Sequence, residues 1–306
     1  MDTLNPATAA LFPGFEQRSV EVEEGVQIAA AIGGSGPPLL LLHGHPQTRA
    51  IWHKVAPALA NRHTVVAADL RGYGDSSKPA GSADHGNYAK RVMARDQREL
   101  MRRLGFERFG VLAHDRGARV AHRLAADHSD AVSRMVLLDV APTLAMYEQT
   151  SEAFARAYWH WFFLIQPAPL PERLIEADPA AYIRDVMGRR SAGLAPFDPR
   201  ALAEYQRCIA LPGAAHGLCE DYRAAAGIDL EHDRADRAAG RKLSMPLLAL
   251  WGEQGVVQRC FHPLDEWRRV ASQVDGEALP CGHYIAEEAP EALLARAAPF
   301  LAEGLA

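Results

Sequence analysis

The most informative segment of this 306-residue chain is Val111-Leu112-Ala113-His114-Asp115-Arg116-Gly117-Ala118-Arg119. Its apolar beginning predicts a buried strand that runs directly into a helix, and the small residues Ala113 and Gly117 allow a sharp turn between the two. Such a turn lifts one side chain above a sheet, in front of the amino end of the helix. That side chain is Asp115, so a serine or cysteine nucleophile is disfavoured. The alternative interpretation is that Asp115 only caps the helix that begins near Arg116.

Short apolar runs on both sides of this segment predict further strands. From Val20 to Ile28 apolar and polar residues alternate, which predicts an antiparallel hairpin. The later runs are continuous, as in parallel strands that are covered on both faces, and a helical pattern over 88–104 lies between two of them. We therefore predict an α/β protein with a mostly parallel sheet flanked by helices. The predicted strands of this kind are 39–42, 65–68, 111–113, 135–138 and 247–250.

The alternation of strands and helices stops at about residue 142 and resumes near Met245. The residues between them contain helical stretches, an aromatic run over 158–163 and a proline-rich run over 166–171, but no convincing strand. This pattern predicts a helical cap that is inserted after the sixth strand. The predicted segments are the first part of the core (1–141), the cap (142–243) and the second part of the core (244–306).

The composition is that of a globular protein, with 48% hydrophobic and 23% charged residues. A net charge of −5 gives no indication of a nucleic-acid surface, and no run approaches the ~18 apolar residues of a membrane span. Asp2 and Pro13 argue against a signal peptide, and the four cysteines lack the spacing of a zinc site or a disulfide framework. The acidic residues over 229–236 show no metal-ligand spacing and are predicted to form a solvated loop. We expect a cytoplasmic enzyme without metal or cofactor.

Backbone donors for a site around Asp115 are predicted in the segment His43-Gly44-His45-Pro46, which follows an apolar strand. The N–H groups of His45 and Arg116 are expected to face a developing oxyanion there. Arg116 and Arg119 lie three residues apart on the first helical turn after Asp115, hence roughly on one face. A guanidinium matches a carboxylate with two hydrogen bonds, so these arginines are predicted to bind an anionic substrate and to keep Asp115 ionised.

The histidine and the acid of the site are predicted from chain order. His283 comes after the last predicted strand, and this position favours it over the other histidines as the base. Asp139 ends the strand 135–138 and is predicted to orient His283, although it could equally serve as a turn residue at a strand end. Glu253, which follows the strand 247–250, is the reserve candidate for the acid.

The chain resembles a fluoroacetate dehalogenase of the α/β-hydrolase fold, and the resemblance extends through both the core and the cap. The matches extend from about residue 36 to 290, and the motifs within the cap are specific to that family. The core motifs are shared with epoxide hydrolases and haloalkane dehalogenases. The resemblance is carried by His43-Gly44-His45-Pro46-Gln47-Thr48, His114-Asp115-Arg116-Gly117-Ala118-Arg119, Tyr158-Trp159-His160-Trp161, Gln166-Pro167-Ala168-Pro169-Leu170-Pro171-Glu172, Cys219-Glu220-Asp221-Tyr222-Arg223 and Gly282-His283.

The resemblance implies a role for each candidate residue. It implies Asp115 as nucleophile, His283 as base, Asp139 as the orienting acid, and Arg116 and Arg119 as ligands of the substrate carboxylate. The implied halide pocket consists of His160, Trp161 and Tyr222, whose N–H and O–H groups can donate hydrogen bonds to a departing fluoride. One departure from the family is visible, because His45 stands where the family usually has an aromatic residue such as Phe. Gly255 stands where many α/β-hydrolases carry their acid, which is why Asp139 is the candidate.

The aromatic run over 158–163 also has a second interpretation, as the core of the cap itself. Trp159, Phe162 and Phe163 have helical spacing and are predicted to be buried together, whereas His160 and Trp161 fall outside that stripe.

We therefore expect hydrolytic dehalogenation of short 2-haloacids, with fluoroacetate as the leading substrate and glycolate and fluoride as products. The first alternative is an epoxide hydrolase or haloalkane dehalogenase, whose neutral substrate would gain nothing from Arg116 and Arg119. A further alternative is a ligand-binding receptor on the same scaffold, which the complete set of catalytic residues disfavours. The expected partner is a small anionic substrate, with no nucleic acid and no membrane, and the resemblance implies a homodimer.

Overall fold

The computed structural model describes residues 6–303 and contains one sheet of eight strands. The strand order is β1-β2-β4-β3-β5-β6-β7-β8, and every pair from β4 onward is parallel. Asp2 and the outer ends of the first and last predicted segments lie outside the described residues. The strands are β1 (Glu16–Glu23), β2 (Val26–Gly33), β3 (Pro38–Leu42), β4 (Thr64–Ala68), β5 (Phe109–His114), β6 (Val132–Leu138), β7 (Leu247–Gly252) and β8 (Val274–Leu279).

The central strands are buried on both faces. Every residue of β5 and β7 is buried, which explains why their sequences are continuous apolar runs. The predicted mostly parallel sheet and the hairpin of β1 and β2 are confirmed. The sequence analysis missed β8, because this edge strand pairs only with β7 and leaves Asp275 and Glu277 exposed.

Helices of the core pack on this sheet, and the helical pattern over 88–104 is confirmed as α3. Within residues 6–303, no helix combines the length and the apolar character needed to cross a membrane. The core helices are α1 (Pro6–Ala9), η1 (Arg49–Lys54), α2 (Ala56–Leu59), η2 (Gly86–Tyr88), α3 (Lys90–Arg103), α4 (Asp115–Asp127), α13 (Val256–Cys260), α14 (Pro263–Val270), α15 (Ile285–Glu288) and α16 (Pro290–Ala302).

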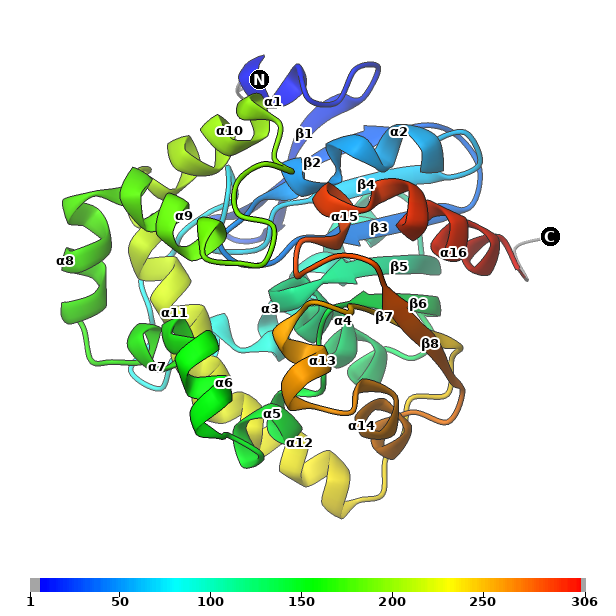
Figure 1. Cartoon of the computed structure of the whole chain (residues 1–306). Coiled ribbons are helices and arrows are strands. Elements are labelled where there is room, and N and C mark those ends of the chain that lie inside the picture. The colour runs from blue at the N-terminus through cyan, green and yellow to red at the C-terminus, as the bar shows by residue number, and fades with distance from the viewer. Residues whose placement is uncertain (1–5, 304–306) are drawn as a thin grey trace.

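Between β6 and β7 the described residues form helices, which we call the cap helices. In Figure 1 these green to yellow helices lie at the left and the bottom of the view. The cap helices are α5 (Thr143–Glu148), α6 (Glu152–Ala157), α7 (Trp159–Leu164), α8 (Leu170–Ala177), α9 (Pro179–Gly188), α10 (Pro199–Ile209), α11 (Ala214–Ala226) and α12 (Ile228–Ala238).

Two expectations about the cap were wrong. The acidic residues over 229–236 form α12 rather than a solvated loop, and Asp229 is buried, because its carboxylate accepts a hydrogen bond from the N–H of Lys90 at 2.8 Å. In α7, Trp159 is 37% exposed, whereas His160 and Trp161 are buried. The face of α7 that points inward is therefore the one that carries these two polar-tipped rings.

Candidate active site

The turn at Asp115 joins β5 to α4 and lifts the carboxylate above the edge of the sheet. Asp115 has a φ of 45°, in the left-handed region that non-glycine residues rarely adopt. A Cβ atom on Gly44 would lie 2.5 Å from the Cβ of Asp115, and one on Gly117 would overlap the carbonyl oxygens of Leu42 and His43. No side chain makes a capping hydrogen bond at the start of α4. The strained turn and the two glycines indicate a functional position rather than an ordinary helix cap.

The carboxylate of Asp115 is buried, and the N–H of His45 donates a hydrogen bond to its Oδ2 at 3.0 Å. Burial by itself raises the pKa of a carboxyl group. The charges of His283, Arg119 and His114 outweigh burial and hold the pKa of Asp115 well below its ordinary value. Asp115 is therefore an anion at neutral pH, which is the form a carboxylate nucleophile requires.

His283 lies beside Asp139, with 2.6 Å between its Nδ1 and Oδ2 of the carboxylate. Asp139 follows β6 with a φ of 48°, and its Oδ1 accepts a hydrogen bond from the N–H of Gly252 at 3.0 Å. A Cβ atom on Gly255 would lie only 3.1 Å from the same Oδ1. Asp139 thus occupies the space beside the end of β7, and Glu253, the reserve candidate, is exposed.

Arg116 is held by the cap through Asp221 of α11. Its Nε and Nη2 donate to Oδ2 and Oδ1 of Asp221, both at 2.8 Å, and its guanidinium lies 4.0 Å from the ring centroid of Tyr222. Lys90 forms an ion pair with the same carboxylate, and Tyr73 donates to its Oδ2 at 2.7 Å. Burial raises the pKa of Asp221, but Arg116 and Lys90 lower it well below its ordinary value. This planar fork fixes Arg116, and Nη1 has no hydrogen-bond partner within residues 6–303.

Arg119 is bound by neutral groups instead. Its Nη1 donates to the carbonyl oxygen of Ala141 at 3.2 Å and to Oγ1 of Thr143 at 3.0 Å. Its guanidinium lies 4.7 Å from the ring centroid of Trp161. Within residues 6–303, Arg119 forms no ion pair with a carboxylate at contact distance, so its positive charge is available to Asp115 and to an anionic ligand.

The three predicted halide ligands come together from α7 and α11. The ring of Tyr222 lies 6.0 Å from that of His160 and 6.3 Å from that of Trp161, measured between centroids. Burial lowers the pKa of His160 well below its ordinary value, so the imidazole is neutral and carries one N–H donor. The set therefore offers three neutral donors of the kind that stabilise a leaving anion.

His45 lies against the halide ligands. Its ring is stacked on His160 at 5.3 Å and meets Tyr222 edge-on at 5.2 Å, and its Nε2 lies 3.2 Å from the hydroxyl of Tyr182. Burial lowers the pKa of His45 to about 3. The departure from an aromatic residue therefore adds a neutral polar ring to the site without adding charge.

Sequence analysis missed three residues around the site. The hydroxyl of Tyr158 lies 3.5 Å from Nδ1 of His283, and Arg190 lies 4.5 Å above the ring of Tyr158. Tyr182 contacts His45. Tyr158 begins the conspicuous aromatic run, but Tyr182 and Arg190 stand in stretches without any motif.

Four buried polar atoms in the predicted substrate residues lack a hydrogen-bond partner among the described residues. They are Nη1 of Arg116, Nε of Arg119, Nε1 of Trp161 and the hydroxyl oxygen of Tyr222. A buried polar group without a partner costs about 1–3 kcal/mol, so most such groups in folded proteins are satisfied. Four of them around one ionised carboxylate indicate a place for a small anionic molecule with several acceptor atoms.

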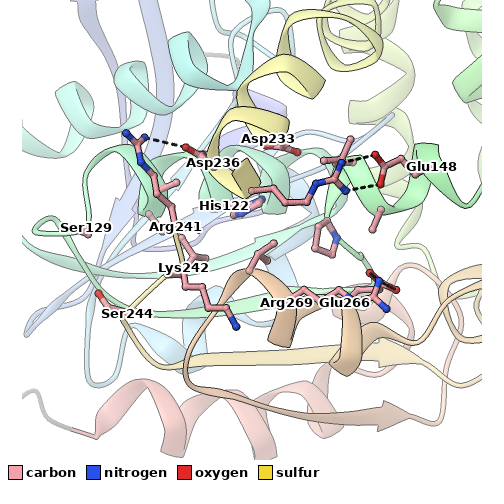
Figure 2. Close-up of a pocket in the computed structure, with 18 of the residues that line it drawn as sticks. His122, Ser129, Glu148, Asp233, Asp236, Arg241, Lys242, Ser244, Glu266 and Arg269 are labelled. Carbon is pink, nitrogen blue, oxygen red and sulfur yellow. Dashed lines mark hydrogen bonds and ion pairs between the residues drawn. The ribbon is translucent and has the colours of Figure 1, made fainter. Parts of the chain in front are cut away.

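A separate cavity of about 260 Å³ lies toward the carboxyl end of α4, and we call it the rear groove (Figure 2). None of the predicted site residues lines it. Its arginines are paired, because Arg237 contacts Glu148 at 2.8 Å and Arg241 contacts Asp236 at 3.0 Å. The rear groove therefore offers volume, but these arginines already have carboxylate partners.

Comparison with known proteins gives the class of this chain. The family model of the alpha/beta hydrolase fold matches residues 37–290. A solved α/β hydrolase from Nostoc sp PCC 7120 superposes with a TM-score of 0.90 at 54% identity, covering 94% of this chain and 98% of that one. The fold and the strained carboxylate turn thus define an α/β-hydrolase.

A curated fluoroacetate dehalogenase from Burkholderia sp is 48% identical over 282 residues, which is 92% of each chain. A soluble epoxide hydrolase from Corynebacterium sp. (strain C12) is 36% identical over 91% of this chain and 94% of its own length. The chain belongs to the fluoroacetate dehalogenase family of α/β-hydrolases and is a hydrolase acting on carbon–halide bonds.

Proposed function

We propose that this enzyme hydrolyses short 2-haloacids, with fluoroacetate as its leading substrate, through an ester on Asp115. The observation that carries the proposal is the set of four unpartnered donors around this ionised carboxylate. Two of them, on Arg116 and Arg119, match the substrate carboxylate, and two, on Trp161 and Tyr222, match the halide.

In the first step, Oδ of Asp115 attacks the α-carbon in line with the departing halide. The carbon–halogen bond breaks, and its electron pair leaves with the halide into the pocket of His160, Trp161 and Tyr222. Each hydrogen bond to a charged acceptor contributes about 1.5–3 kcal/mol, so three donors that strengthen as charge develops lower the barrier by several kcal/mol. Arg116 holds the carboxylate in position because Asp221 fixes its guanidinium.

In the second step, water attacks the carbonyl carbon of the ester on Asp115. His283 accepts the proton of that water, and Asp139 orients the ring and stabilises its charged form. The N–H of His45 already contacts Oδ2 of Asp115, and the N–H of Arg116 is the second predicted donor to the oxyanion. Collapse of the intermediate releases the hydroxy acid and restores Asp115.

The deciding experiment measures fluoride release from fluoroacetate and chloride release from chloroacetate, with Asp115→Asn as control. We expect release from both substrates, and none from the variant. A single turnover in ¹⁸O-labelled water should give unlabelled glycolate and label in Asp115, because the glycolate oxygen comes from that side chain. Label in the glycolate would contradict the covalent route.

The second candidate is epoxide hydrolysis, which the likeness to the Corynebacterium enzyme and the unpartnered hydroxyl of Tyr222 favour. A phenol can protonate an epoxide oxygen, and Asp115 can open the ring. Arg116 distinguishes haloacid hydrolysis from epoxide hydrolysis, because a neutral epoxide does not need a guanidinium to bind it. We expect Arg116→Leu to abolish haloacid turnover, and full retention of activity would favour the epoxide.

A further inference from the structure

Arg190 is a partly exposed cation beside the site that the haloacetate chemistry does not use. It lies in the segment between α9 and α10, with its guanidinium above Tyr158 at 4.5 Å. The residue is partly exposed, but its Nε is buried and has no hydrogen-bond partner among the described residues. Its charge acts on Asp115, His45 and His160, so it belongs to the same site.

No carboxylate of the described chain pairs with Arg190 at contact distance, unlike Arg116, which Asp221 neutralises. Its guanidinium lies beside the neutral rings of Tyr158 and Tyr284. A buried or half-buried cation without an anionic partner is costly. Arginine at such a position is suited to bind a carboxylate that arrives with a ligand.

His45 supplies a second unused polar atom. Its Nε2 contacts Tyr182, whereas its Nδ1 is buried and lacks a partner within residues 6–303. The carboxylate and the halide of a haloacetate account for the free donors of Arg116, Arg119, Trp161 and Tyr222. Nε of Arg190 and Nδ1 of His45 remain without a ligand group, although both lie around the same nucleophile.

We propose that Arg190 and His45 form a third subsite for a second carboxylate, so that the enzyme also dehalogenates 2-halo dicarboxylic acids. This proposal rests on the proposed function. The carboxylate next to the halogenated carbon binds Arg116 and Arg119, the halide enters its pocket, and the remaining arm of the α-carbon extends toward Arg190. Because Arg190 is partly exposed, the second carboxylate keeps some of its hydration beside this residue.

The reaction on 2-fluorosuccinate follows the same two steps as the reaction on fluoroacetate. Asp115 forms a bond to C2 while the carbon–fluorine bond breaks and fluoride leaves with the electron pair. Water then cleaves the ester at the carbonyl of Asp115, His283 takes the proton, and the products are 2-hydroxysuccinate, fluoride and a proton. Attack opposite the leaving fluoride inverts the configuration at C2.

The test compares kcat/KM for 2-fluorosuccinate, 2-fluorobutanoate and fluoroacetate, followed by fluoride release. 2-Fluorobutanoate has the same carbon skeleton without the second carboxylate. In the native enzyme we expect 2-fluorosuccinate to exceed 2-fluorobutanoate about tenfold or more, as for one charge-assisted hydrogen bond. Arg190→Gln should reduce that ratio to about one, whereas Arg189→Gln, on the exposed neighbouring residue, should preserve it.

A binding measurement guards against variants that fold poorly. Calorimetry on Asp115→Asn should show tighter binding of 2-fluorosuccinate than of 2-fluorobutanoate, and adding Arg190→Gln should remove the difference. Turnover of fluoroacetate without any preference for the dicarboxylate would overturn the third subsite alone. An equal loss on all three substrates in Arg190→Gln would overturn it as well, and would assign Arg190 to the halide. Failure of every substrate, fluoroacetate included, would overturn the proposed function itself.

Discussion

The site around Asp115 and the rear groove are two regions of the molecule with opposite chemistry. Around Asp115, buried donors on Arg116 and Tyr222 have no partner in the described chain. In the rear groove, Nη1 and Nη2 of Arg237 donate hydrogen bonds to the carboxylate of Glu148, at 2.8 and 2.9 Å. In Figure 2 the two dashed lines that reach Glu148 mark this pair.

Unpartnered polar atoms gathered beside an ionised carboxylate locate this site better than cavity volume does. Folding satisfies its own polar groups wherever it can, because each buried unpaired group is costly. Groups left unpaired beside a strained carboxylate at φ 45° persist when a ligand completes them. A roomy groove with paired charges needs no ligand to complete it.

The largest effect is expected at the acid that orients His283. Asp139→Asn should lower kcat for fluoroacetate by roughly 10³–10⁴-fold, as in other triads, because the amide favours the wrong histidine tautomer. Glu253→Gln is the matched control, since this exposed carboxylate was the other candidate from the sequence. Steady-state fluoride release measures both variants. Loss of activity in Glu253→Gln with retention in Asp139→Asn would reverse the assignment.

A smaller but still large effect is expected at Asp221. Asp221→Asn leaves the buried guanidinium of Arg116 without its carboxylate partner, which costs about 3–5 kcal/mol of unfolding free energy, whereas Lys90 keeps a second partner in Asp229 at 3.7 Å. It should also raise KM for fluoroacetate about tenfold, since Arg116 loses the fork that positions it. Denaturant unfolding and steady-state kinetics measure the two effects.

Asp233→Asn in the rear groove is the matched control for Asp221. Asp233 contacts Arg123 at 2.7 Å, but Arg123 keeps a second partner in Asp236 at 2.6 Å. We expect a much smaller loss of stability and unchanged KM. Equal losses of stability and equal changes in KM in the two variants would show that the site around Asp115 and the rear groove do not differ in this respect.

The third effect concerns the pH dependence of stability. His45 has a pKa of about 3 in the folded chain, against an ordinary value of 6.5. Between these values the unfolded chain binds a proton that the folded chain does not, so stability falls as pH drops below 6.5, by about 1.4 kcal/mol per pH unit. His45→Phe should remove this contribution and make the profile measured by denaturant unfolding from pH 7 to 5 less steep, whereas His114 and His160, whose pKa values are also lowered by burial, keep their contributions. An unchanged slope would show that His45 is protonated in the folded chain.

The local part of the site was predictable from the sequence, because each of its signals lies within a few residues. Asp115 stands in a strand-to-helix turn with small neighbours, and Asp139 stands where a buried apolar run ends. Arg190 was not predictable, because its only sequence neighbour of note is the exposed Arg189, and a pair of arginines ordinarily indicates a solvated surface. Its place above Tyr158 depends on how distant cap helices pack.

The same limit explains the errors in the fold. The edge strand β8 lacks the apolar run that identifies its buried neighbours. The sequence predicts a loop in place of α12, because few residues of this helix are buried. Asp229 is buried in α12 by its contacts with Lys90, a residue that comes 139 positions earlier in the chain. Contacts between residues so far apart in the chain depend on the assembled fold, and no local sequence pattern predicts them.

The smallest effect is expected for Arg237→Gln in the rear groove. The Arg237–Glu148 pair is 57% and 39% exposed, so water screens it, and neither the melting temperature nor kcat/KM should change measurably. Differential scanning calorimetry and fluoride release test this. A clear drop in kcat/KM would instead implicate α5, because Leu144 and Ala145 line the groove while Thr143 of the same helix contacts Arg119. The site around Asp115 and the rear groove would then be coupled through α5, and the groove would affect catalysis.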